Sequence, residues 1–255
     1  MQTESYKSRS FKIEDSDARL RKGSTLQDFV LDAAGAIRII PQGREIKVKE
    51  ITTVPTGAKS VNVYVLALDA SNGEELGWTS ATNLAGKFYS ETIGLIKAPS
   101  GGNKFGPHAA WKDGAYIGQI DLVRIVGTNY EVEHIAADSC DEFVALTTAA
   151  RQDGASIRLN SGFRSYPEQK YLYDGRKKGL PGFNPANPPG SSNHQNGVAF
   201  DLDVKPGEGN PNYEWLKKNA TRFGFVRTVR TEAWHWEYLP QKAAKARTNG
   251  KSTTW

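Results

Sequence analysis

The stretch SSNHQNGVAFDLD, residues 191–203, places a histidine and an aspartate seven residues apart with a glycine between them. It follows a Pro-Pro-Gly turn and runs into a short apolar strand. A catalytic zinc ion usually takes three protein ligands and leaves a fourth position for water. His194 and Asp201 offer two such ligands, so a third must come from elsewhere in the chain.

A second segment, EAWH at residues 232–235, supplies His235 and, three residues earlier, Glu232. Two histidines and an aspartate form a mixed nitrogen and oxygen set that suits zinc, and Glu232 is a spare carboxylate for general base catalysis. Residues three apart on a regular strand point to opposite faces, so we predict a bulge or turn at residues 233–234. Each segment alone has an ordinary alternative, a surface histidine or a chance Glu-x-x-His pair.

Together with a third segment, these motifs resemble the LAS family of zinc peptidases, which cut peptidoglycan stem peptides. Residues 192–201 match its S-x-H-x-x-G-x-A-x-D pattern, residues 232–235 its E-x-W-H, and residues 161–169 its S-G-[YF]-R-S-x-x-x-Q. Within the family, the chain is most similar to VanY-type D-alanyl-D-alanine carboxypeptidases. Phage-type endopeptidases tend to carry D-x-P-H in place of EAWH, and D-Ala-D-Ala dipeptidases tend to carry D-G-Y-R-P in place of SGFRS.

The resemblance implies a function for each motif residue. His194, Asp201 and His235 would hold one zinc ion per chain, with water in the fourth position. Glu232 would take a proton from that water and return it to the departing amine. Arg164 would stabilise the oxyanion of the tetrahedral intermediate.

Three further residues are candidates for substrate binding. Ser192 is expected to hydrogen-bond the terminal carboxylate of the substrate, with capping of the turn before His194 as its alternative. Trp234 is expected to wall the substrate pocket, with a place in the hydrophobic core as its alternative. Gln169 is the third candidate, with support of the site as its alternative.

The first half of the chain has the pattern of β structure. Residues 36–54 alternate apolar and charged side chains, and residues 60–69 form a β-branched run before a turn at 71–75. The GW-x-x-x-x-x-L that follows resembles bacterial Src-homology-3-like domains, which often bind cell walls. A β domain that serves stability alone is the alternative. We expect a small all-β barrel before an α+β catalytic domain of the LAS and hedgehog-type zinc peptidase fold.

The second half mixes helices and strands. The sequence predicts strands on both sides of GTN at 127–129, a helix over 136–154, and a final strand over 232–239. Further helices are predicted after Ser165, an N-cap with Glu168 at the capping-box position, and before Gly224. The expected parts are an N-terminal extension (1–23), the barrel (24–96), a linker (97–106), the zinc peptidase domain (107–240) and a basic tail (241–255).

Composition narrows the range of functions. The single cysteine, Cys140, excludes an intrachain disulfide, and no stretch approaches the ~18 apolar residues of a membrane span. The net charge is +5, but no nucleic-acid motif accompanies it. The N-terminus has no apolar signal-peptide region, so the protein either acts in the cytoplasm, is exported by another route, or lacks its leader. We expect it to act on the bacterial cell wall, in the periplasm or outside the cell, and a phage or delivered origin is an alternative.

The predicted function is removal of the terminal D-Ala from peptidoglycan stem peptides by a zinc carboxypeptidase. The first alternative is a peptidoglycan endopeptidase, acting as a phage lysin or a delivered toxin, with the barrel as a targeting module. The second is a non-enzymatic, zinc-binding module of the hedgehog type. The presence of both Glu232 and Arg164 argues against that second alternative.

Overall fold

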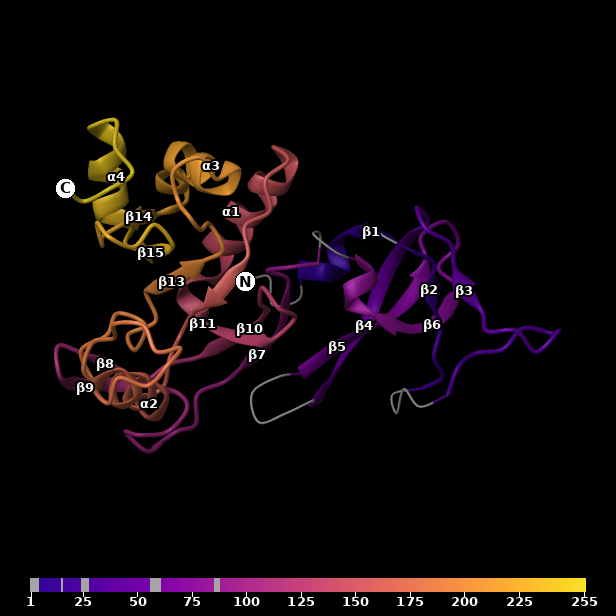
Figure 1. Cartoon of the computed structure of the whole chain (residues 1–255), viewed down its shortest axis with the longest axis horizontal. Coiled ribbons are helices and arrows are strands. Elements are labelled where there is room, and N and C mark those ends of the chain that lie inside the picture. Colours follow the sequence, from indigo (N-terminus) through magenta and orange to yellow (C-terminus); the bar gives the residue numbers. More distant parts are fainter. Residues whose placement is uncertain (1–4, 15, 24–27, 56–60, 85–87) are drawn as a thin grey trace.

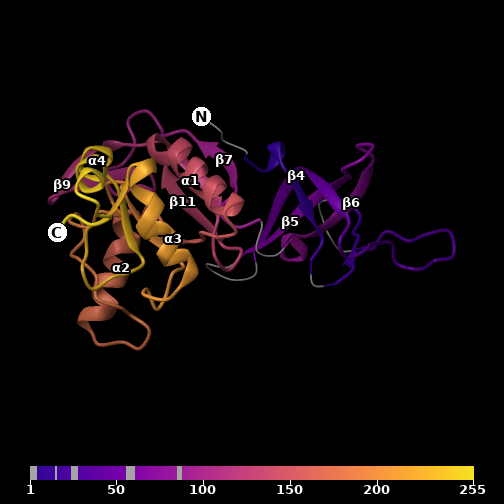
Figure 2. The same ribbon diagram turned by 90° about the horizontal axis from the view of Figure 1, so that it is seen from above.

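The computed structural model describes residues 5–14, 16–23, 28–55, 61–84 and 88–255. An N-terminal β region and a C-terminal region of helices and strands lie side by side along the long axis of the molecule (Figure 1). The view from above shows the same division, with the labelled α-helices all in the C-terminal region (Figure 2).

The N-terminal region is built on an antiparallel sheet with the strand order β1-β4-β5-β6. Its strands are β1 (Ser10–Lys12), β4 (Glu45–Pro55), β5 (Val61–Asp69) and β6 (Glu75–Ser80). A separate ladder pairs β2 (Ala18–Arg19) with β3 (Ile39–Ile40), and Arg21 then bridges to Trp78 of β6. β5 covers the predicted β-branched run except residue 60, which lies outside the described residues.

The sequence predicts an extension over the first 23 residues, but residues 5–14 and 16–23 are part of this fold. β1 forms an edge of the sheet, and the backbone N–H of Ser5 donates to Thr92 Oγ1 at 2.7 Å. The carboxylate of Glu91, which is fully buried, takes the Ser5 hydroxyl and the Arg9 guanidinium as partners. A buried carboxylate is costly unless it is hydrogen-bonded or paired with a cation. These contacts therefore hold Ser5 and Arg9 in place.

The C-terminal region contains two sheets, with strand orders β11-β10-β7 and β12-β13-β15-β14, and the β8–β9 hairpin. Its strands are β7 (Thr92–Ile96), β8 (Ala109–Lys112), β9 (Ala115–Gln119), β10 (Leu122–Val126), β11 (Val132–Ala136), β12 (Leu159–Ser161), β13 (Ala199–Leu202), β14 (Phe225–Arg227) and β15 (His235–Tyr238). We had expected residues 92–96 in the barrel, but β7 pairs with β10 instead. β-Branched residues in both strands fit this pairing.

The helices begin and end where local signals place them. They are α1 (Cys140–Gln152), α2 (Tyr166–Lys177), α3 (Pro211–Asn219) and α4 (Pro240–Thr248). Ser165 and Glu168 form the predicted capping box of α2. The short 3₁₀ helix after α3 ends at Gly224, whose φ of 81° is the left-handed conformation that glycine adopts at little cost.

The core of the C-terminal region packs α1 and α3 against the sheet that carries β13 and β15. Phe143 of α1, Phe200 of β13 and Trp236 of β15 are fully buried in one cluster. Burial of one such side chain contributes about 2–3 kcal/mol, so this cluster makes the sheet a rigid platform. Asp201, beside Phe200, and His235, beside Trp236, take their positions from it.

The expected basic tail is folded rather than free. Helix α4 buries Ala243 and Ala246, three residues apart on one face, against Val226 of β14. Beyond the helix, Thr253 bridges to Arg227, whose guanidinium lies 4.9 Å from the Trp255 ring centroid. Among the described residues, no helix is both long and apolar enough to cross a membrane.

Candidate metal centre

Two neighbouring strands and one turn bring the candidate ligands together. Asp201 on β13 and His235 on β15 are direct partners in the antiparallel register, so their side chains lie on one face of the sheet. His194 comes from the turn before β13. Gly197 in that turn has a φ of +79°, and a Cβ there would lie 2.7 Å from the Cβ of Ala136, so only glycine fits.

The ligand atoms of His194, Asp201 and His235 all lie within 4.8 Å of one another. His194 Nε2 is 3.4 Å from Asp201 Oδ2, and His235 Nδ1 is 3.1 Å from Asp201 Oδ1. Both histidines are buried. The structure therefore assembles the three residues that the sequence motifs predicted as ligands.

In each candidate histidine, the ring nitrogen that points away from Asp201 forms a hydrogen bond, and this bond orients the imidazole ring. His194 Nδ1 lies 2.7 Å from the Gly162 carbonyl oxygen, so it donates there and leaves Nε2 facing Asp201. His235 Nε2 lies 3.1 Å from Glu237 Oε1, which leaves Nδ1 facing Asp201. Two inward nitrogen atoms and a carboxylate oxygen are a donor set that fits zinc.

The electrostatics of the centre favour a cation. Burial would raise the pKa of Asp201, but His194, His235 and Arg164 outweigh it and hold the pKa well below its ordinary value. Burial lowers the pKa of His194. Burial also opposes protonation of His235, yet the carboxylates of Asp201 and Glu237 raise its pKa to about 9. At neutral pH a metal ion would therefore displace a proton from His235.

Glu232 stands at the edge of this centre. The chain turns at residues 233–234, as predicted, and the backbone N–H of His235 donates to the Glu232 carbonyl at 3.2 Å. Glu232 Oε2 comes within 3.9 Å of His235 Nδ1, and the Glu232 side chain keeps 32% of its surface exposed. The carboxylate is thus close to the candidate ligands and still open to solvent.

The guanidinium group of Arg164 also contacts this centre, through Asp201. Its Nη2 donates to Asp201 Oδ2 at 2.7 Å and its Nε to Ser161 Oγ at 2.9 Å. Gln169, which is fully buried, accepts from Arg164 Nη1 at 3.5 Å and donates to the Asn187 carbonyl at 2.8 Å. These contacts place Gln169 as a support for the arginine.

Two other predicted residues lie near the centre without contacting the ligand atoms. The buried Ser192 hydroxyl accepts the backbone N–H of His194 at 3.4 Å, which corresponds to the turn-capping alternative. The half-buried Trp234 packs against the core, and Lys205 Nζ lies 4.5 Å from its ring centroid.

Glu237 is a further residue of this centre, and the sequence motifs did not reveal it. This residue is only 3% exposed, and besides His235 it accepts from Asn193 Nδ2 at 2.7 Å. Burial raises its pKa, but His235 and Asn193 hold the pKa below its ordinary value, so the group is an anion. Strand alternation could have identified it, because residues 235 and 237 share a face of β15.

Replacing Glu237 by glutamine is expected to weaken zinc binding by about 10–100-fold, because the ring of His235 loses its charged partner. Competition with a chromogenic chelator measures this affinity directly. The control is Asp203→Asn, the same chemical change at a carboxylate whose one ion-pair partner among the described residues is Arg158, at 4.0 Å. Equal affinities for the Glu237 variant and the control would show that Glu237 does not position His235.

Another carboxyl group with a shifted pKa, the half-buried Glu133 on β11, accepts a hydrogen bond from the backbone N–H of Gly162. Burial raises its pKa to about 8, and a hydrogen bond from the Gly162 backbone only partly offsets this. Because the folded state binds this proton more tightly than the unfolded state, its contribution to stability is complete below about pH 4.5 and is lost as the pH rises through 8. Ionised Glu133 therefore destabilises the fold in mild alkali.

Glu133→Gln is accordingly expected to raise the free energy of unfolding by about 1–3 kcal/mol at pH 8, with little change at pH 4.5. Urea unfolding of both proteins at the two pH values tests this. A stability difference that does not depend on pH would contradict the assignment.

The comparison with known proteins agrees with this centre. Residues 132–241 match the model of the VanY family, D-alanyl-D-alanine carboxypeptidase. The match contains all three candidate ligands and both Glu232 and Arg164.

Individual relatives extend the comparison. A D-alanyl-D-alanine carboxypeptidase of Enterococcus faecalis is 32% identical over 123 residues, which cover 39% of this chain and 46% of the relative. The putative carboxypeptidase YodJ of Bacillus subtilis is 29% identical over 134 residues, 44% of this chain and 49% of the relative. The chain thus spans about half the length of these relatives. The solved structure of VanYB in complex with D-Alanine-D-Alanine is 27% identical and covers 56% of this chain and 92% of its own, with a TM-score of 0.43.

Proposed function

We propose that the protein is a zinc-dependent D-alanyl-D-alanine carboxypeptidase that removes the terminal D-Ala from peptidoglycan stem peptides. The observation that carries the proposal is the convergence of His194, Asp201 and His235 with both rings oriented by outer hydrogen bonds. The VanY match over residues 132–241 supports the same function.

The residues of the centre divide the chemistry between them. Zinc, when bound by His194, Asp201 and His235, polarises the scissile carbonyl and lowers the pKa of water to about 7. Glu232 takes the proton from the attacking water and transfers it to the nitrogen of the departing D-Ala. Arg164 stabilises the negative charge on the carbonyl oxygen, an effect typically worth about 3 kcal/mol of barrier.

We propose that Ser192 binds the substrate carboxylate while it caps the turn. Its oxygen accepts the His194 N–H, and the hydroxyl hydrogen is left to donate to a carboxylate oxygen. We assign Trp234 to the wall of the substrate pocket, because it directly precedes His235 and stays partly exposed. Gln169 acts by holding Arg164.

We also propose that the N-terminal β region is a cell-wall-binding domain of the Src-homology-3-like class, and that the enzyme acts on the bacterial wall outside the cytoplasm. The support is the GW-x-x-x-x-x-L sequence and the antiparallel sheet whose strand β6 carries its Gly-Trp pair. Attachment to the wall would raise the local concentration of stem peptides at the metal centre.

Two versions of one stem pentapeptide test the reaction type. A carboxypeptidase must recognise the terminal carboxylate, so it is expected to cleave the free pentapeptide and to leave the C-terminally amidated pentapeptide intact. Purified sacculi are digested in parallel, and all products are identified by mass spectrometry. Cleavage of both peptides at an internal bond would make the protein an endopeptidase instead. Release of cross-linked fragments from sacculi, with both pentapeptides left intact, would lead to the same conclusion.

A further inference from the structure

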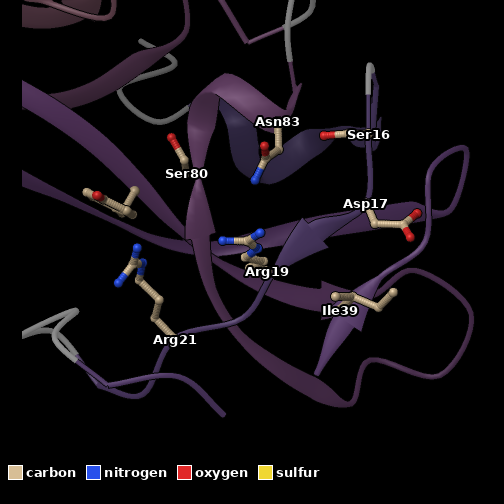
Figure 3. Close-up of a pocket in the computed structure, with 8 residues that line it drawn as sticks. Ser16, Asp17, Arg19, Arg21, Ile39, Ser80 and Asn83 are labelled. Atoms are coloured by element: carbon tan, nitrogen blue, oxygen red, sulfur yellow. The ribbon is translucent and has the colours of Figure 1, made fainter. Parts of the chain in front are cut away.

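A pocket of about 550 Å³ lies in the N-terminal region, apart from the candidate metal centre. Its polar lining includes Arg19, Arg21, Tyr64, Ser80 and Asn83. Figure 3 shows the guanidinium groups of Arg19 and Arg21 in this pocket, with the Asn83 amide above Arg19.

The backbone explains why these side chains converge. Arg19 and Arg21 are two residues apart in an extended segment, so they point to the same side. Arg21 exchanges backbone hydrogen bonds of 2.7 and 3.1 Å with Trp78, which fixes the segment beside β6. Tyr64 and Ser80 are direct partners across β5 and β6. The two cationic groups therefore lie beside neutral hydroxyl groups on one surface.

The described residues that line the pocket carry a net positive charge. Asp17 is the one acidic residue among them, but its Oδ1 accepts the Gln42 N–H at 2.9 Å, and Figure 3 shows its carboxylate turned away from both arginines. The Arg21 guanidinium is held 4.4 Å from the Phe29 ring centroid. Arg19 is exposed and forms no ion pair within the part of the chain that the structure describes.

We propose that this pocket binds a phosphodiester group of an anionic cell-wall polymer. A guanidinium group forms two parallel hydrogen bonds to phosphate oxygens. Two guanidinium groups side by side offer more donors and more positive charge than one carboxylate can pair with. The hydroxyl groups of Tyr64 and Ser80 supply neutral donors for the remaining oxygens. Exposed Arg19 and Ile39 leave the pocket open to solvent, so a polymer chain can cross it. The choice of a wall polymer rests on the proposed function, whereas the choice of phosphate rests on the pocket itself.

A fluorescent glycerol phosphate oligomer is a suitable probe, with binding followed by anisotropy at low ionic strength. A polyglutamate of equal charge separates phosphate from carboxylate recognition. The test variant is the double substitution Arg19→Gln, Arg21→Gln in the full chain. Arg38→Gln is the matched control, since it removes an exposed arginine of the same region outside the pocket. Thermal unfolding of each variant establishes that it is folded.

The oligomer is expected to bind the wild type and to bind the double variant about tenfold more weakly or worse, with Arg38→Gln unchanged. The proposal is overturned if the wild type does not bind, if the folded double variant binds equally well, or if polyglutamate competes as strongly as the oligomer. Pentapeptide hydrolysis by the same preparations is expected to be equal in all three proteins. A wild type that binds the oligomer without cleaving the peptide would overturn the proposed function and leave this site standing.

Discussion

Replacing Glu232 by alanine is expected to reduce turnover by about 10³–10⁴-fold while the metal remains bound, because a general base of this kind contributes up to that factor. Glu232 comes no nearer than 3.9 Å to the ligand atom of His235, and its carboxylate is partly exposed, so its loss leaves the three ligands in place. The readouts are kcat on the free pentapeptide and zinc content by elemental analysis.

The control for this variant is Glu208→Ala, which removes an exposed glutamate that pairs only with Lys217 among the described residues. The control is expected to retain full activity and full zinc content. Normal turnover in Glu232→Ala would remove Glu232 as the general base. Loss of zinc from that variant would make it a ligand instead.

The second large effect is expected for His194→Ala, which should not retain zinc at neutral pH. The remaining pair, Asp201 and His235, offers only two ligands, and His235 carries a proton until about pH 9. Zinc content should fall from near stoichiometric to nearly zero, and hydrolysis should fall with it.

His134→Asn is the matched control for that variant, because His134 is a half-buried histidine outside the candidate ligand set. Circular dichroism and thermal unfolding show whether each variant is folded. A folded His194→Ala protein with one zinc per chain would contradict the ligand assignment.

The metal centre was largely predictable because its motifs are local in sequence. The spacing of His194 and Asp201 and the paired Glu232 and His235 predicted the candidate ligands, which the structure brings together, and strand geometry required the turn at residues 233–234. The capping box of Ser165 was predictable for the same reason, since it depends on residues three positions apart.

Features that depend on distant contacts were not predictable. Strand alternation places Glu237 on the same face of β15 as His235, but the burial of Glu237 and its contact with Asn193, 44 residues away in the sequence, depend on the tertiary fold. Ser5 and Arg9 join the N-terminal residues to the fold through the buried Glu91, and the tail joins it through Ala243 and Ala246. In each case a polar or small residue has no pattern that reveals its partner.

The most direct test of this account is a mass spectrum of the free stem pentapeptide after incubation with zinc-loaded protein. We expect one tetrapeptide and free alanine, in an amount that exceeds the enzyme, with no product from Glu232→Ala or from protein treated with a chelator. An intact pentapeptide in the presence of folded, zinc-loaded protein would contradict the proposed carboxypeptidase.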